Sequence, residues 1–67
     1  MDSTTQDLIR HLFARMSNHL EIALDAAMAG QNATVDDAKA VDLCTSINVA
    51  ISNAQVIAAA INAVAEP

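Results

Sequence analysis

Four polar side chains in the N-terminal half recur every four residues and could in principle bind a metal or transfer protons. They are Asp7, His11, Arg15 and His19. On a helix this spacing places them along one side, where favourable pairs four residues apart stabilise the helix by about 0.2–0.5 kcal/mol each. Two histidines of one helix chelate a metal when they are four apart, whereas His11 and His19 have the Arg15 cation between them. We therefore expect a solvated polar face and no metal site.

Two other groups could carry chemistry. Glu21 and Asp25 are carboxylates four apart, as in half of a di-metal site, but Leu24 stands where the Glu-x-x-His motif of such sites needs a histidine. Cys44 would need a nearby cation or a helix N-terminus to become a reactive thiolate, and Asp42 is the nearest charge in sequence. We expect Cys44 to be buried and to pack as a small apolar side chain. The sequence predicts no catalytic residue, no cofactor and no enzymatic activity.

The composition indicates one small, acidic, alanine-rich domain over residues 1–67. Hydrophobic residues make up 54% of the chain, and Phe13 is the only aromatic residue. The net charge is −5, with only three basic residues. Because Lys and Arg contacts to phosphate dominate nucleic-acid affinity, we expect no nucleic-acid partner. One unpaired cysteine and an N-terminus without the basic and apolar regions of a secretory signal favour the cytoplasm.

A first helix is predicted over residues 4–29. Thr4, or Ser3 before it, can cap its N-terminus, since Asp7 or Gln6, respectively, follows three residues later in the capping-box spacing. Gly30 is the single glycine, and we expect it to end this helix in the left-handed conformation. Residues 1–3 are predicted to be a flexible N-terminus, and residues 30–34 the inter-helix loop.

A second helix is predicted over residues 34–65. Thr34 can cap it, with Asp37 at the capping-box position and favourably placed near the positive end of the helix dipole. No glycine or proline follows until Pro67, so this helix can run unbroken for about 45 Å at 1.5 Å per residue. The alternative is a break near Thr45-Ser46, which would give a compact three-helix bundle.

Apolar residues recur in both helices with a period close to 3.5. In the first helix they form the row Ile9, Phe13, Met16, Leu20, Ala23 and Ala27. The second helix has two overlapping rows, one of Cys44, Ile47, Ile51, Ala54, Ala58, Ile61 and Ala65, and one of Leu43, Ile47, Ala50, Ala54, Ile57, Ile61 and Val64. A helix that is apolar around so much of its circumference is usually buried, and one helix of the same chain cannot cover it.

We therefore predict an all-α fold: a helical hairpin of two long antiparallel helices that self-associates, in its simplest form as a dimeric antiparallel four-helix bundle. The predicted self-association core comprises Ile9, Phe13, Met16, Leu20, Leu43, Ile47, Ile51, Ala54, Ile57, Ile61 and Val64. A small domain without disulfides or a metal needs such a partner chain for stability.

The segment Leu43–Ala65 has no charged residue and is long enough to cross a bilayer. It nevertheless carries four amide side chains, Asn48, Asn53, Gln55 and Asn62. An unpaired amide in an apolar medium costs several kcal/mol, and no Trp, Tyr, Lys or Arg flanks the segment as an interfacial anchor. We expect a soluble helix packed against other helices rather than a membrane span.

These features favour a small non-enzymatic protein–protein interaction module that homo-oligomerises and docks on another protein. The acidic surface would suit a basic or mixed patch on that partner. One alternative is a self-assembling structural subunit of a helical filament, ribbon or shell. Another is a small accessory subunit of a membrane complex, with residues 43–65 inserted.

Overall fold

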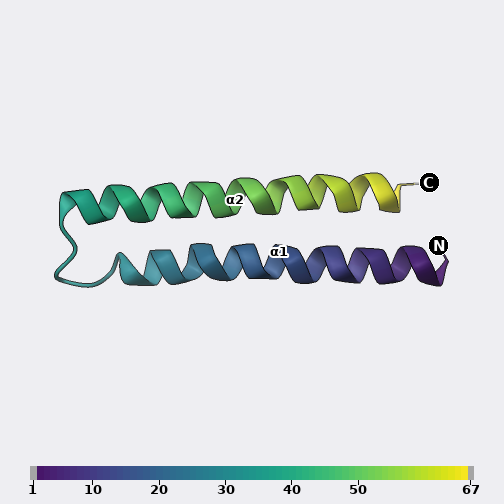
Figure 1. Ribbon diagram of the computed structural model, residues 1–67, viewed down its shortest axis with the longest axis horizontal. Helices are drawn as coiled ribbons and strands as arrows, with labels where there is room; N and C mark the ends of the chain where they lie inside the picture. Colours follow the sequence, from purple (N-terminus) through teal and green to yellow (C-terminus); the bar gives the residue numbers. More distant parts are fainter. Residues whose placement is uncertain (1, 67) are drawn as a thin grey trace.

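The chain forms two helices that pack side by side as a hairpin (Figure 1). The computed structural model describes residues 2–66, with α1 spanning Ser3–Ala29 and α2 spanning Asp37–Ala65. The hairpin measures 50 × 14 × 10 Å, and its radius of gyration is 15.5 Å, against about 11 Å for a compact domain of this length. The predicted all-α helical hairpin is confirmed. Met1, in the predicted flexible N-terminus, and Pro67 lie outside the described residues.

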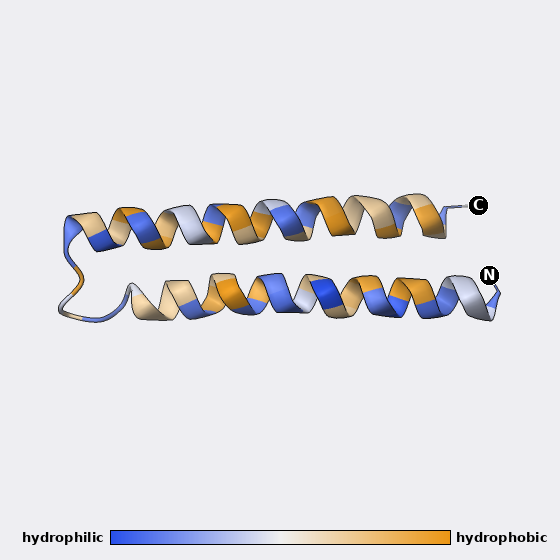
Figure 2. Ribbon diagram, in the orientation of Figure 1, coloured by the Kyte–Doolittle hydropathy of each residue, from blue (hydrophilic) through white to orange (hydrophobic). Residues whose placement is uncertain are grey.

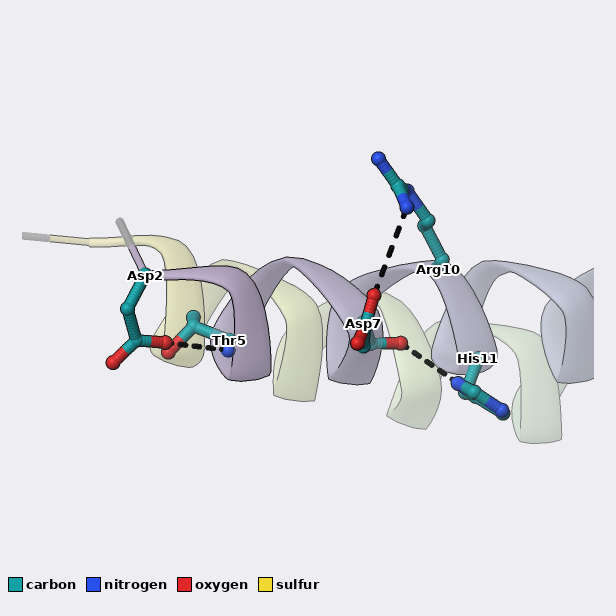
Figure 3. Close-up of polar contacts among 5 residues, drawn as sticks. All are labelled: Asp2, Thr5, Asp7, Arg10 and His11. Atoms are coloured by element: carbon teal, nitrogen blue, oxygen red, sulfur yellow. Dashed lines mark hydrogen bonds and ion pairs between the residues drawn. The ribbon is translucent and has the colours of Figure 1, made fainter.

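The N-terminus of α1 is capped by Asp2. Its Oδ1 accepts a hydrogen bond of 2.7 Å from the Thr5 amide (Figure 3). The Gln6 amide donates to the Asp2 carbonyl oxygen at 3.0 Å. The prediction that Thr4 caps this helix is therefore wrong, because a carboxylate two residues earlier already satisfies the first amides. Ser3 is accordingly helical and not part of a flexible end.

The cap of α2 is Asp36, two residues after the predicted Thr34. Asp36 Oδ1 accepts from the Lys39 amide at 2.8 Å, and the Ala40 amide donates to the Asp36 carbonyl at 2.9 Å. Thr34 is engaged elsewhere, because its amide and its hydroxyl both donate to Asn32 Oδ1, at 2.9 and 2.8 Å. The prediction of Thr34 as the cap is wrong, and the connection between the helices runs over residues 30–36.

Gly30 does mark the end of α1, but not in the predicted conformation. Its φ and ψ are −66° and −15°, which is right-handed helical backbone, and its amide donates to the Ala26 carbonyl at 3.0 Å. The chain leaves the helix through shorter turns, in which Gln31 donates to the Met28 carbonyl at 3.1 Å and Asn32 to the Ala29 carbonyl at 3.2 Å. These bonds satisfy the last carbonyls of α1 without a left-handed residue.

Helix α2 runs without a break through Thr45 and Ser46. The Thr45 hydroxyl donates to the Val41 carbonyl at 3.0 Å, a bond to the preceding turn that a threonine within a helix commonly makes. Thr45 therefore does not act as a cap, and the three-helix alternative is wrong.

The core of the hairpin is thin and rich in alanine. Among the described residues, the buried side chains are Ala23, Ala26, Ala50, Ala54, Ile57 and Ile61. Alanines occupy the half of the seam that is nearer the loop, and the two isoleucines occupy the half nearer the chain ends. Small side chains allow the helix axes to approach closely, but each contributes little buried apolar area.

The α1 side of this seam differs from the predicted row. Leu12, His19 and Ala26 take part in it, whereas Phe13, Leu20 and Ala27 are exposed. Ile9, Met16 and Ala23 belong to both rows. The sequence is ambiguous because apolar residues lie on either side of this shared line, and only the position of α2 selects one side.

Candidate interaction surface

Two faces of the hairpin flank the seam between α1 and α2. When two helices pack along each other, the contacts repeat about every 3.5 residues, so residues seven apart lie on the same side of a helix. On one side this spacing defines the Phe13 face, made up of Gln6, Phe13, Leu20, Ala27, Asp37, Cys44, Ile51, Ala58 and Ala65. On the opposite side it defines the Ile22 face, made up of Leu8, Arg15, Ile22, Ala29, Lys39, Ser46, Asn53 and Ala60.

The Phe13 face contains an open groove of about 250 Å³. Its walls are Phe13, Met16, Ala58, Ile61, Asn62 and Ala65, so residues of both helices contribute to this one face. The one charged residue of the Phe13 face is Asp37, at the loop end of α2, and the residues from Phe13 to Ala27 and from Cys44 to Ala65 on this face are uncharged. Away from Gln6 and Asp37, this side of the hairpin is therefore an uncharged and mostly apolar surface that is built from two helices.

The Ile22 face contains a second open groove, of about 350 Å³. It is lined by His19, Ile22, Thr45, Ser46, Val49, Ala50 and Asn53. This face also carries Arg15 and Lys39, two of the three basic residues of the chain. It is thus more polar than the Phe13 face, although its groove is the larger of the two.

The predicted self-association residues fall into two groups in the hairpin. Seven of them pack between α1 and α2 of the same chain and are buried or half-buried: Ile9, Met16, Leu43, Ile47, Ala54, Ile57 and Ile61. The other four are exposed: Phe13, Leu20, Ile51 and Val64. Three of these, Phe13, Leu20 and Ile51, lie on the Phe13 face. The single chain therefore leaves uncovered the residues that a second chain could contact.

Large apolar side chains are exposed along the full length of both helices, as the hydropathy colouring in Figure 2 also indicates. Their exposed fractions range from 36% for Val64 to 70% for Val56. The other nine are Leu8, Phe13, Leu20, Ile22, Leu24, Met28, Val41, Val49 and Ile51. Single exposed apolar residues are ordinary in soluble proteins, but eleven of them on so small a hairpin are typical of an interaction surface.

The polar side chains near the N-terminus make local contacts only. His11 Nδ1 donates to the Asp7 carbonyl oxygen at 2.8 Å, and Arg10 Nη1 lies 3.6 Å from Asp7 Oδ1 (Figure 3). Both side chains of this ion pair are mostly exposed, so the pair contributes little to stability. His19 does not belong to this exposed group, because it is half-buried at the seam between the two helices. Within residues 2–66, no three His, Cys, Asp or Glu side chains come together as metal ligands would.

The hydrogen bonds at Asp2 lower the pKa of its carboxyl group. The main cause is the bond from the Thr5 amide, and the Thr5 hydroxyl adds to it. Glu21 and Asp25 are exposed on α1. Cys44 is also exposed, so the prediction of a buried thiol is wrong for the single hairpin. It lies on the Phe13 face, which α1 of the same chain does not cover.

Among the described residues, α2 is the one helix whose length and apolar composition would allow it to cross a bilayer. Only 17% of its most apolar 18-residue stretch is buried by α1. This property rests on length and composition alone, and a helix that packs in a soluble assembly can share it.

His19 is the residue of these surfaces that sequence reasoning missed. Its spacing from His11 predicts a place in a solvated ladder, but it continues the seam of Leu12, Met16 and Ala23 at alternating spacings of four and three. This spacing could have identified His19 as a seam residue, but its polar side chain favours an exposed position.

Comparison with known protein families, with curated proteins and with solved structures finds no match for this chain.

Proposed function

We propose that this chain is a small, non-enzymatic helical module that associates with itself and docks on a partner protein. The self-associated form is a dimeric antiparallel four-helix bundle. The observation that carries the proposal is the exposure of eleven large apolar side chains on a hairpin in which six residues of the described chain are buried. Stable soluble domains rarely leave so much apolar surface in water.

The thin core supports association for a second reason. Four of the six buried residues are alanines, and no large side chain of the described residues is fully buried. Burial contributes about 25 cal/mol per Å² of apolar area, so alanine pairs stabilise a hairpin weakly. A second copy would supply the apolar contacts that a chain of 67 residues cannot supply to itself.

The polar groups support a role without catalysis. Asp7, Arg10 and His11 are exposed and make contacts only within one turn or two of α1. Catalysis by nucleophile and base requires side chains that converge from different positions around a reacting atom. With a net charge of −5, a protein partner would present a basic or mixed patch, and the unpaired Cys44 suits the reducing cytoplasm.

Light scattering over a dilution series, with helicity followed by circular dichroism, tests the self-association. We expect a mass near twice the 7.0 kDa of one chain at high concentration, and a joint loss of mass and helicity on dilution. A fully helical monomer at every concentration would overturn the proposal. Growth without an end point would favour the structural-subunit alternative, in which both apolar faces bind neighbouring copies.

Docking on another protein is tested separately, by photo-crosslinking in cells. A crosslinker placed at Val49, in the groove of the Ile22 face, should give a defined adduct with a second protein. The matched control is Glu21, which is exposed on α1 outside both grooves, and which should give none. Equal labelling from both positions, or from neither, would contradict specific docking through this groove.

A second candidate is an accessory subunit of a membrane complex, and it is favoured by the length and composition of α2. Against it stand the four amides Asn48, Asn53, Gln55 and Asn62, each of which is exposed in the hairpin. Partition of the chain into detergent or lipid vesicles, with no soluble fraction, would select this candidate over the soluble dimer.

A further inference from the structure

We propose that the Phe13 face, and not the Ile22 face, is where the second copy binds, and that the loops of the two copies lie at opposite ends of the assembly. This proposal rests on the self-association proposed above. It adds which surface is used and how the two hairpins are oriented. The juxtaposition that carries it is the pair of uncharged stretches, Phe13–Leu20–Ala27 of α1 and Cys44–Ile51–Ala58–Ala65 of α2, that the hairpin places on one face.

The first argument is the amount of surface to be covered. The hairpin has an accessible surface of 4907 Å². A compact monomeric protein of 7.0 kDa would have about 4,000 Å² from the scaling of surface with mass. The excess, about 900 Å², is close to the roughly 800 Å² that each partner buries in an interface of standard size. One second copy on one face is therefore enough to remove it.

The second argument selects the face. Interface cores are depleted of charge and enriched in large apolar and aromatic side chains. The Phe13 face has Phe13, Leu20 and Ile51 exposed by 51%, 44% and 38%, with Leu24 at its border. The one charge of the Phe13 face, Asp37, lies at the loop end of α2. The Ile22 face carries Lys39 and also Arg15, which lies near the middle of α1, and burying either cation without a partner would oppose association.

The third argument sets the orientation. The half of the hairpin near the loop, residues 16–54, carries five acidic residues and one basic residue, a net charge of −4. The half near the chain ends carries three acidic and two basic residues, a net charge of −1. Loops at the same end would place the two strongly acidic halves together. Loops at opposite ends place each acidic half beside a nearly neutral one, which lowers the repulsion.

Matched charge substitutions on the two faces test the choice of face. We expect Leu20→Lys and Ile51→Lys each to raise the dimer dissociation constant by about 100-fold, since a buried unpaired cation is strongly unfavourable. Ile22→Lys and Val49→Lys, at positions of similar exposure on the Ile22 side, should change it by less than about threefold, as rim charges do. Sedimentation equilibrium measures all four variants.

A second measurement keeps the chain folded and nearly unaltered. A photo-crosslinker at Ala58, on the Phe13 face, should give covalent dimers, whereas one at Ala60, on the Ile22 face, should not. Two results would overturn the proposed face and leave self-association intact. One is a covalent dimer from a crosslinker at Ala60 but not from one at Ala58. The other is a loss of dimer in the lysine variants of the Ile22 side alone. A wild-type chain that is monomeric throughout would instead overturn the proposed function itself.

Discussion

The Asp36 carboxylate accepts a hydrogen bond of 2.8 Å from the Lys39 amide, and this contact begins α2. Asp36→Ala should therefore lower the free energy of unfolding by about 1 kcal/mol, because it removes an N-cap. Asp36→Asn keeps an acceptor at the same place and should cost only a few tenths of that. Urea unfolding measures both. If Thr34→Ala proved as costly as Asp36→Ala, Thr34 would be contributing the cap after all.

The conformation of Gly30 leads to a second prediction. Its φ of −66° suits any L-residue, and a Cβ built there would lie 3.4 Å from the Ala27 carbonyl oxygen and 3.8 Å from Leu43 Cδ1. Gly30→Ala should raise the free energy of unfolding by about 0.4–1 kcal/mol, since alanine loses less backbone entropy on folding. Thermal unfolding compared with wild type measures the change. A clear destabilisation would mean that Gly30 adopts a left-handed conformation in solution.

His19 provides a test of the seam. It is half-buried between α1 and α2 and forms one wall of the larger groove. His19→Leu should stabilise the hairpin by about 1 kcal/mol, because it adds apolar area at a position where area is scarce. His11→Leu is the control, since His11 is exposed and bonded to the Asp7 carbonyl, and it should not stabilise. Equal effects would place both histidines on the solvent side.

The cap at Asp2 predicts a response to acid. Hydrogen bonds from Thr5 lower the pKa of this carboxyl group below its ordinary 3.8, so the cap contributes stability above that value. This contribution is lost as the pH falls through the lowered pKa. The Thr5 amide resonance, followed by NMR from pH 6 to pH 2, should report a midpoint below 3.8. Asp2→Asn should abolish the titration, and a midpoint above 3.8 in wild type would contradict the cap.

Cys44 is a natural probe of the orientation of two copies. It lies seven residues from the midpoint of α2, about 10 Å along the helix axis. With loops at opposite ends and the two hairpins overlapping over their full length, the two thiols lie about 20 Å apart along that axis, too far for a disulfide or a short bismaleimide. We expect no covalent dimer under oxidation. A disulfide that forms rapidly between associated wild-type chains would place the loops at the same end.

The number, type and approximate bounds of the helices could be predicted from the sequence, because periodicity and a single glycine are strong local signals. The caps could not, since Asp2 and Thr4, or Thr34 and Asp36, are equally plausible acceptors until the loop geometry engages one of them. The predicted row of α1 likewise contains only some of the residues that pack against α2, because the sequence leaves two neighbouring rows open.

Leu12 and Phe13 are adjacent apolar residues on either side of the line through Ile9 and Met16. Choosing between them requires the position of α2, which is tertiary information. Which apolar residues remain exposed also depends on how the two helices pair. The sequence predicts Phe13, Leu20 and Ile51 as residues of the self-association core, but only the pairing of the two helices shows that they are exposed on one shared face.

Because the core is thin, the amount of the folded, paired form depends steeply on the amount of chain that is synthesised. When folding and pairing are coupled, the paired form grows with the square of chain concentration at low abundance, while unpaired chains remain open to proteases. A twofold change in synthesis would then alter the paired form about fourfold. A hairpin that buries six described residues would thus convert a gradual change in expression into a steeper change in the amount of the paired form.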